Sequence, residues 1–325
     1  MITIECFGRI NLGIIDLSDH PYRIDGTHGL YTNLKIATIK LKRFSELSIN
    51  IGSEFEKPLF QVVERCLKYL KKSNKYEDVF VEIHSLFNRH IGLGSGTQIS
   101  MSIVEAFNLE FSLELTLNEK ALLAGSGGTS GVGVYCFENG GYVLDSGRLF
   151  PQEKSSIGPS EAFCFEKLSP LISRLELPNW NICFLIPKTK SFIEGEKEQD
   201  LFDAFTPIKQ NETGEICKWI LKGIMPAILE KNFESFCYSI EQIMKLGFRA
   251  KEIHYYGNFL SDRINALKKS GLNGVGMTSF GPTLFGFFDN YSMQQFIYNY
   301  INTLFPTDTV IFTTTRNIGA NINIL

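Results

Sequence analysis

Two glycine-rich segments of this chain have residue types and spacings that could bind phosphate, and a third segment combines one glycine with a proline. The first, NRHIGLGSGTQ at residues 88–98, alternates three glycines and ends where a helical pattern begins. Glycine lets the backbone come close to a ligand, and the free N–H groups at the start of a helix attract anions. A plain tight turn before a helix is the alternative interpretation. We predict phosphate contacts from five residues of this segment: Gly92, Gly94, Ser95, Gly96 and Thr97.

Two further segments lie later in the chain. GSGGTSGVG at residues 125–133 packs five glycines and three hydroxyl side chains into nine positions. Ordering so many glycines costs conformational entropy, which favours a backbone that must approach a ligand over a flexible linker. We therefore predict a second phosphate cradle, formed by Gly128, Thr129 and Ser130. The third segment, TSFGPT at residues 278–283, is by itself a turn, in which Phe280 and Pro282 are candidate substrate contacts.

Acidic residues within or beside the motif segments could hold a metal ion. Asp16, Asp25 and Asp145 are candidate ligands of Mg2+, because this ion prefers one or two carboxylates together with substrate phosphates. For Asp16 and Asp25, a role in turns or caps is the alternative.

Basic residues near the same segments could bind an anionic substrate. Arg9 and Arg23 can grip a phosphate or a carboxylate through two N–H groups, although surface ion pairs would also explain them. His90 could donate to a phosphate or could be a structural histidine. The candidate catalytic residues are therefore Asp16, Arg23, Asp25 and His90.

Helical and strand patterns alternate along the chain and must position these segments. Helical periodicity covers residues 58–72, and the first glycine segment lies between a strand pattern at 79–86 and a helical pattern at 97–111. Further helical patterns occupy residues 118–124, 197–205, 213–229, 233–246, 259–269 and 292–304. Strand patterns include residues 3–7, 10–17, 32–51, 142–145, 181–186, 274–278, 283–288 and 310–312. This mixture predicts an α+β protein.

Length and composition limit the possible domain organisation and binding partners of the chain. With 325 residues the chain suits two domains, which we place at residues 1–150 and 160–325 around a linker at 149–159. The formal net charge of −3 offers no basic field for nucleic acid. The seven cysteines show no CxxC pair, which argues against a disulfide framework and a structural zinc site. No apolar run suggests a signal peptide or a membrane span, so we expect a cytoplasmic protein.

Taken together and in order, GLGSG, GGTSG and SFGPT resemble the three motifs of the GHMP kinase superfamily. The resemblance is closer to one family within it, the β-ribofuranosylaminobenzene 5′-phosphate synthases. The segments that carry it span residues 9–320 and comprise RINLGIID at 9–16, RIDG at 23–26, HIGLGSGTQ at 90–98, GGTSG at 127–131 and RNIGA at 316–320.

The resemblance implies a fold, a reaction and substrates. It implies a two-domain GHMP fold with a ferredoxin-like C-terminal domain, a left-handed β–α–β crossover in the first domain, a site between the domains and a possible homodimer. The implied reaction joins phosphoribosyl pyrophosphate to a 4-amino- or 4-hydroxybenzoate-like acid with release of carbon dioxide and pyrophosphate, in a methanopterin-type pathway or in C-nucleoside formation. Magnesium is the implied cofactor.

Several positions depart from the related proteins. Where GHMP kinases carry an aspartate, this chain has Gly133, and no acid occurs between Gly125 and Phe137. Asn11 stands where the synthases usually have histidine, and His28 lies where a glycine is common. We treat Arg9, Asn11 and His28 as candidate substrate contacts. An ATP-dependent small-molecule kinase and a non-catalytic binding protein are the alternatives.

Overall fold

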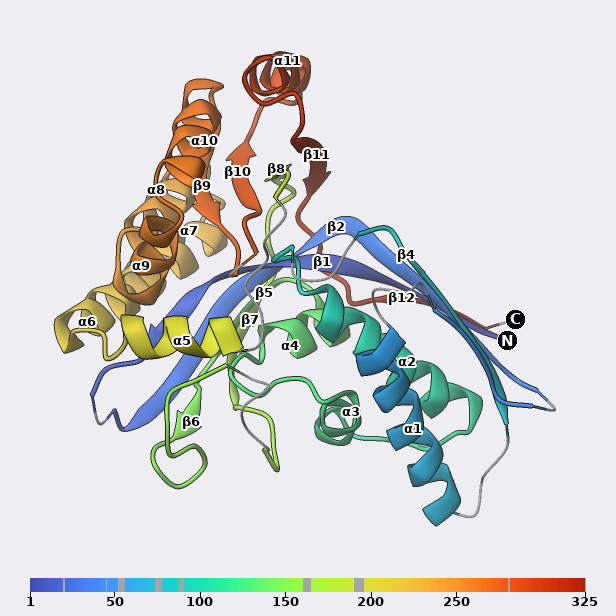
Figure 1. Ribbon diagram of the computed structural model, residues 1–325. Coiled ribbons are helices and arrows are strands. Elements are labelled where there is room, and N and C mark those ends of the chain that lie inside the picture. The colour runs from blue at the N-terminus through green and yellow to red at the C-terminus, as the bar shows by residue number, and fades with distance from the viewer. Residues whose placement is uncertain are drawn as a thin grey trace.

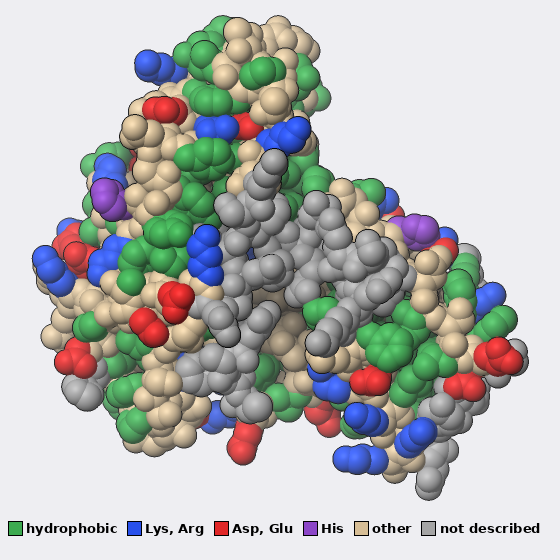
Figure 2. Space-filling view, viewed as in Figure 1, with side chains coloured by type: hydrophobic (Ala, Val, Ile, Leu, Met, Phe, Trp, Pro, Cys, Tyr) green, Lys and Arg blue, Asp and Glu red, His purple; other side chains and the backbone are tan. Residues whose placement is uncertain are grey.

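The computed structural model describes residues 1–19, 21–44, 46–51, 56–73, 78–87, 91–159, 165–189, 196–279 and 281–324. Two of the predicted site residues, His90 and Phe280, lie outside these ranges. Of the helices that the structure describes, none offers the length and hydrophobicity that crossing a bilayer demands. On the face shown in Figure 2, acidic and basic side chains are interspersed rather than gathered into a field of one sign.

An eight-stranded sheet forms the larger layer (Figure 1). Its strands are β1 (Ile2–Asp16), β2 (Arg23–Arg43), β3 (Ser48–Ile51), β4 (Val79–Ser85), β5 (Tyr142–Asp145), β6 (Arg148–Leu149), β7 (Leu171–Leu175) and β12 (Asn321–Ile324). The main path runs β12-β1-β2-β4-β3, while β5 and β6 pair with β2, and β7 pairs with β5. β3 and β4 run parallel with α1 between them in the chain, which makes them the crossover unit whose left-handedness stays a prediction.

Four helices cover one face of this sheet. They are α1 (Glu56–Lys72), α2 (Ser95–Glu110), α3 (Leu117–Ala124) and α4 (Val132–Asn139). Their apolar side chains and those of β1, β2 and β4 form one buried core, which includes Ile4, Ile39, Val63, Val104 and Val134. The helices therefore bring the starts of α2 and α4, which lie within the first and second glycine segments, to the same side of the sheet.

A four-stranded antiparallel sheet forms the second layer. Its order β11-β8-β10-β9 joins β8 (Asn181–Ile186), β9 (Asn273–Met277), β10 (Leu284–Phe288) and β11 (Thr309–Thr314). Helices separate β8 from β9 and β10 from β11, which is the βαββαβ order of a ferredoxin-like domain. The predicted α+β class and ferredoxin-like C-terminal domain are therefore confirmed.

The remaining helices pack between and around the two sheets. They are α5 (Glu196–Phe205), α6 (Gln210–Trp219), a π-helical turn (Ile220–Ile224), α7 (Met225–Leu229), α8 (Phe233–Ile243), α9 (Gly247–Tyr255), α10 (Asn258–Lys269), a 3-10 turn (Tyr291–Met293) and α11 (Gln294–Leu304). A second core joins α6 and α8 to the opposite face of the large sheet, through residues such as Ile10, Leu30, Phe236 and Ile240. This core connects the two halves of the chain.

The predicted domain boundary near residue 150 stays a prediction. β7 and β12 come from the second half of the chain, yet both belong to the large sheet. The predicted linker, residues 149–159, includes Lys154, whose side chain is almost fully buried.

Candidate active site

The first glycine segment forms a tight loop that leads directly into α2. Gly92 and Gly94 both have positive φ, 90° and 75°, which glycine adopts without strain. Gly94 occupies the cap position of α2, and no side chain caps the helix start. A helix start without a side-chain cap keeps its first N–H groups available, together with the positive end of the helix dipole. Ser95, Gly96 and Thr97 form this first turn, so the predicted phosphate contacts share one place.

Arg9 lies against this loop from β1. Its Nη1 donates to Gly92 O at 2.9 Å, and a Cβ added to Gly94 would lie 2.8 Å from Arg9 Nε. None of the ion pairs within the described part of the chain includes Arg9. Burial lowers the pKa of Arg9 to about 10, and the nearby Arg249 acts in the same direction. Arg9 thus places a cation beside the loop, and no described acid pairs with it.

The third glycine segment packs against the first. A Cβ added to Gly92 would overlap Thr278 Oγ1, and a Cβ added to Gly281 would overlap the backbone N of Gly92. Only glycine permits this approach of two backbones. Pro282 follows in a buried position of the same turn. The structure therefore brings segments about 190 residues apart in sequence into direct contact, as the prediction of a shared site requires.

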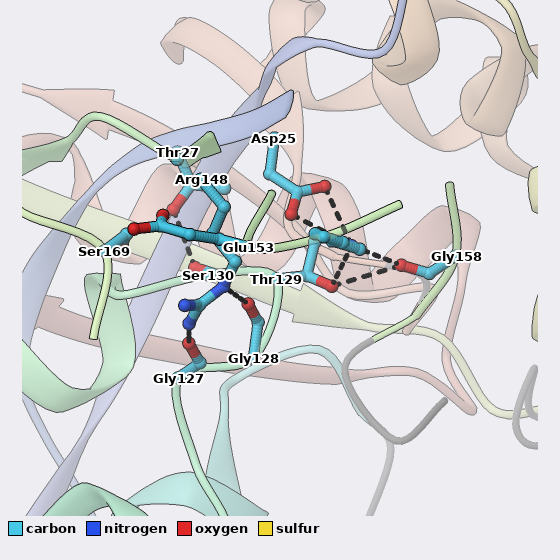
Figure 3. Close-up of polar contacts among 12 residues, drawn as sticks. Asp25, Thr27, Gly127, Gly128, Thr129, Ser130, Arg148, Glu153, Gly158 and Ser169 are labelled. Carbon is cyan, nitrogen blue, oxygen red and sulfur yellow. Dashed lines mark hydrogen bonds and ion pairs between the residues drawn. The ribbon is translucent and has the colours of Figure 1, made fainter. Parts of the chain in front are cut away.

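The second glycine segment is held residue by residue (Figure 3). The Arg148 guanidinium donates from Nε to Gly128 O and from Nη2 to Gly127 O. Thr129 Oγ1 accepts from Lys154 Nζ at 3.1 Å. Since these contacts are made by buried side chains, the loop is fixed before any ligand arrives.

The hydroxyl of Ser130 connects the second segment to the large sheet. Its Oγ lies 2.8 Å from Thr27 Oγ1 on β2 and accepts from Asn11 Nδ2 on β1 at 3.3 Å. Thr27 in turn donates to Asp145. Asn11 is therefore close to the second glycine segment, as a candidate substrate contact should be.

Asp25 forms a buried ion pair. Both of its carboxylate oxygens accept from Lys154 Nζ, at 2.9 and 3.1 Å, and both side chains are almost completely shielded from solvent. Burial raises the pKa of Asp25 to about 6, against the opposing effect of the Lys154 charge. Asp25 also has a positive φ of 67°, which is uncommon for aspartate. Its carboxylate is engaged within the protein.

Asp145 is engaged still more completely. One oxygen accepts from Gly147 N and Ser169 Oγ at 2.9 and 2.8 Å, and the other accepts from Gly131 N and Thr27 Oγ1. Burial raises its pKa, while these hydrogen bonds act in the opposite direction. Four donors fill the acceptor sites of a carboxylate. Asp145 therefore ties the second glycine segment to the sheet.

Asp16 and Arg23 lie toward the far end of the β1–β2 pair. Asp16 Oδ1 accepts from Ser18 N and Oγ and from Thr213 Oγ1. Arg23 donates to the carbonyls of Ser146 and Gly147. Asp16 lies seven positions after Arg9 on β1, which at about 3.3 Å per residue is about 23 Å. A single diphosphate therefore cannot contact both Arg9 and Asp16.

The structure does not bring Asp16, Asp25 and Asp145 together as one ligand group. Among the described residues, no cluster of three or more His, Cys, Asp or Glu side chains could hold a metal ion.

His28 points to the face of the sheet opposite α4 and the second glycine segment. Its neighbour Gly29 faces α4, because a Cβ there would lie 2.8 Å from Val132 Cγ1, and successive strand residues point to opposite faces. His28 Nδ1 instead lies 3.1 Å from Tyr142 Oη in the second core. Burial lowers the pKa of His28 to about 3, so the ring is neutral. The structure does not place His28 with the other candidates.

Four residues that the sequence analysis did not single out hold the site together. They are Gln98, Arg148, Lys154 and Arg249. Gln98, the last residue of the first segment, accepts from Tyr31 Oη at 2.9 Å and donates to Gly133 O at 2.7 Å. Only its position at the end of the motif could have suggested this role. For the three cations the sequence gives no signal of burial, because charged side chains are rarely buried.

Comparisons with known proteins define the class first. Residues 61–141, which contain the first two glycine segments, match the family model described as the GHMP kinases N terminal domain. Homoserine kinase from Cytophaga hutchinsonii superposes with a TM-score of 0.70 over 99% of this chain and 97% of that one, at 15% identity. Mevalonate kinase from L. major gives 0.70 over 97% and 96%, at 10% identity. The fold is that of the GHMP kinases.

The sequence relatives narrow this class to one family. The chain is 32% identical to the beta-ribofuranosylphenol 5′-phosphate synthase of Archaeoglobus fulgidus over 100% of both chains. It is also 32% identical to the synthase of the same name from Methanocaldococcus jannaschii, over 99% of this chain and 100% of that one. This chain belongs to the beta-ribofuranosylphenol 5′-phosphate synthase family and is a ribosyl-transferring enzyme.

Proposed function

We propose that this enzyme joins phosphoribosyl pyrophosphate to 4-hydroxybenzoate with loss of carbon dioxide and pyrophosphate. The observation that carries the proposal is the uncapped start of α2, which lies beside an arginine without a described acidic partner. The relatives' name contains a phenol, which is the ring that remains when 4-hydroxybenzoate loses its carboxylate. 4-Aminobenzoate is therefore the second choice of acceptor. The pathway would be of the methanopterin type or one that makes a C-nucleoside.

The first loop would bind the leaving diphosphate. Backbone N–H groups for this contact would come from Gly92, Gly94, Ser95, Gly96 and Thr97. Arg9 adds a positive charge, and its attraction to the diphosphate becomes stronger as water is excluded from the site. Gly128, Thr129 and Ser130 would bind the other phosphate, close to Asn11. Arg9 contacts the first glycine segment and Asn11 contacts the second. The two residues are two positions apart on β1, about 7 Å, so one donor molecule could reach both segments.

The proposed reaction balances without a general base. The bond between ribosyl C1 and the diphosphate oxygen breaks, and the oxygen keeps the electron pair. The ring carbon that bears the carboxylate bonds to C1, and the electron pair of the bond to the carboxylate returns to the ring as carbon dioxide departs. No proton needs to be removed from carbon.

The neighbourhood of Gly133 fits this chemistry better than phosphoryl transfer from ATP. A Cβ added to Gly133 would lie 2.8 Å from Thr97 Cγ2, so the place of the kinase aspartate has no room for a side chain unless Thr97 moves. The two buried candidate acids, Asp25 and Asp145, are both engaged by donors from the protein. A hydroxyl acceptor would therefore find no available base among them.

Magnesium belongs to the proposal as a partner of the donor diphosphate. When bound, it would neutralise charge on the leaving group. Of the three candidate aspartates, Asp25 and Asp145 use both carboxylate oxygens in contacts within the protein. Only Asp16 keeps an oxygen outside the hydrogen bonds described above, and it lies far along β1 from Arg9. The ion would be held mainly by phosphates and water.

The test is direct. The protein is incubated with magnesium, phosphoribosyl pyrophosphate and carboxyl-labelled 4-hydroxybenzoate, and release of labelled carbon dioxide and of pyrophosphate is followed. We expect both in equal amounts, and less with 4-aminobenzoate. A parallel incubation with ATP and small alcohols should give no ADP. Pyrophosphate release without carbon dioxide, or ADP formation alone, would refute the proposal. The homodimer and the cytoplasmic location stay predictions, of which the first is tested by light scattering.

A further inference from the structure

Arg249 is a buried arginine on α9, outside the three glycine segments. Its side chain is 4% exposed and pairs with Glu252 Oε2 at 2.7 Å, one helical turn further along. An arginine paired with a glutamate on its own helix would normally need no other explanation. The remaining contacts of this guanidinium, however, all lead out of α9.

Two of these contacts reach β1. Arg249 Nη2 donates to Asn11 O at 3.1 Å and to Asn11 Oδ1 at 3.3 Å. Because its oxygen is held in this way, the Asn11 amide turns its Nδ2 toward Ser130 Oγ, at 3.3 Å. Arg249 therefore determines the orientation of the side chain that touches the second glycine segment.

A third contact reaches the third glycine segment. Arg249 Nη1 donates to Thr278 O, and Thr278 Oγ1 fills the space beside Gly92. The same guanidinium is thus connected to the first glycine segment through Thr278 and to the second glycine segment through Asn11. β1, the first loop and the second loop come from the first half of the chain, whereas α9 and the third segment come from the second half.

We infer that Arg249 is a positioning residue that sets the three glycine segments relative to one another for binding of the donor phosphates. A planar guanidinium can donate in several fixed directions at once, whereas a lysine ammonium on a flexible stem cannot hold the same separation between acceptors. Its charge also acts at the site, since Arg249 contributes to the lowered pKa of Arg9. Arg249 Nε makes no hydrogen bond to any described residue, so one N–H group of this guanidinium is unsatisfied within the described structure.

Arg249→Met and Arg249→Lys test the inference, with Arg263→Met as the matched control. Arg263 also pairs with an acid at 2.7 Å and donates to a backbone carbonyl, but it lies on α10 and contacts Asp308 and Phe259. Arg263 is less deeply buried, with 13% of its side chain exposed, and the control measures what loss of an acid-paired arginine outside the site does to stability. Asn11→Ala is the milder variant should Arg249→Met fail to fold.

The first readout does not depend on the reaction. Hydrogen exchange is measured by mass spectrometry on the full chain, over residues 91–98, 127–131 and 278–283. We expect exchange to rise in all three segments in Arg249→Met and Arg249→Lys, and to stay at the wild-type level there in Arg263→Met. An increase confined to α9 would overturn the inference, whatever the enzyme's substrates are.

The second readout rests on the proposed function. For Arg249→Met we expect kcat/KM for phosphoribosyl pyrophosphate to fall about 100-fold, the effect of misplacing reacting groups by about 1 Å. The affinity for inorganic pyrophosphate should fall as well, and Arg249→Lys should not restore either. An Arg249→Lys variant with wild-type kcat/KM would contradict the positioning role. Inactive wild-type protein with the expected exchange pattern would count against the proposed function only.

Discussion

Thr97 and Gly133 face each other across the starts of two helices, where a Cβ on Gly133 would lie 2.8 Å from Thr97 Cγ2. Thr97 is part of the first glycine segment, and Gly133 is the residue at which the resemblance to GHMP kinases led us to expect an aspartate. Gln98, the residue after Thr97, donates to Gly133 O at 2.7 Å and so fixes the contact. The packing of α2 on α4 therefore leaves little room for a side chain at residue 133.

Gly133→Ala should destabilise the protein by about 1–3 kcal/mol, the usual effect of forcing an extra carbon into a packed interior. Gly214→Ala is the matched control, because a Cβ there meets nothing within 4 Å and alanine favours a helix. Unfolding in urea measures both. Combining Gly133→Ala with Thr97→Ser, which removes the opposing methyl group, should recover part of the loss. A fully stable Gly133→Ala would show that Thr97 yields freely.

Arg9→Met should weaken binding of inorganic pyrophosphate by about 10- to 100-fold, since a hydrogen bond to a charged group contributes about 1.5–3 kcal/mol. Its stability should change little or increase, because no described acid is left unpaired. Isothermal titration calorimetry gives the affinity. Lys35→Met, which removes an exposed pair with Glu5 on the same two strands, is the control and should bind normally. Equal affinities for both variants would remove Arg9 from the phosphate site.

Lys154→Met should make the free energy of unfolding depend more strongly on pH. The pKa of Asp25 in the folded protein, about 6, already lies above its unfolded value of 3.8, so its favourable contribution is complete below the unfolded value and is lost as the pH rises through 6. Without Lys154 the folded pKa rises further, and the loss extends to higher pH. The variant should therefore lose more stability at about pH 8 than at about pH 5.

The double variant Asp25→Asn/Lys154→Met is the control for this titration. It has no carboxylate at residue 25, so the extra loss at the higher pH should disappear. Urea unfolding at both pH values measures the difference. A loss of equal size at both pH values in Lys154→Met would mean that Asp25 does not titrate in this range.

Removal of divalent ions should abolish the proposed reaction without lowering the melting temperature. The buried aspartates Asp25 and Asp145 are satisfied by protein donors, so no structural metal is needed to stabilise them. Differential scanning calorimetry in EDTA, with activity restored by added magnesium, tests this. A large drop in melting temperature in EDTA would point to a bound structural ion instead.

The helical and strand patterns predicted many elements closely. The strands at residues 142–145 and 181–186 have the predicted bounds, and the helices at 197–205 and 259–269 differ from the structure by one residue at one end. Periodicity works for these elements because each buries one face or is wholly buried. α4 and α9 were not predicted. α4 begins within a glycine run, and α9 carries several charged residues, so neither shows a clear apolar stripe.

The sequence by itself determined the class of the fold and the three glycine segments, because glycine spacing and the order of motifs are local properties of the chain. It could not determine which charged side chains are buried, since burial depends on what packs against them from distant segments. Only the tertiary structure showed that Lys154 neutralises Asp25, that Asp145 is filled by four donors and that His28 faces the opposite side of the sheet. Only the tertiary structure, too, placed Arg249, more than 230 residues after Asn11 in the chain, where it joins the three segments.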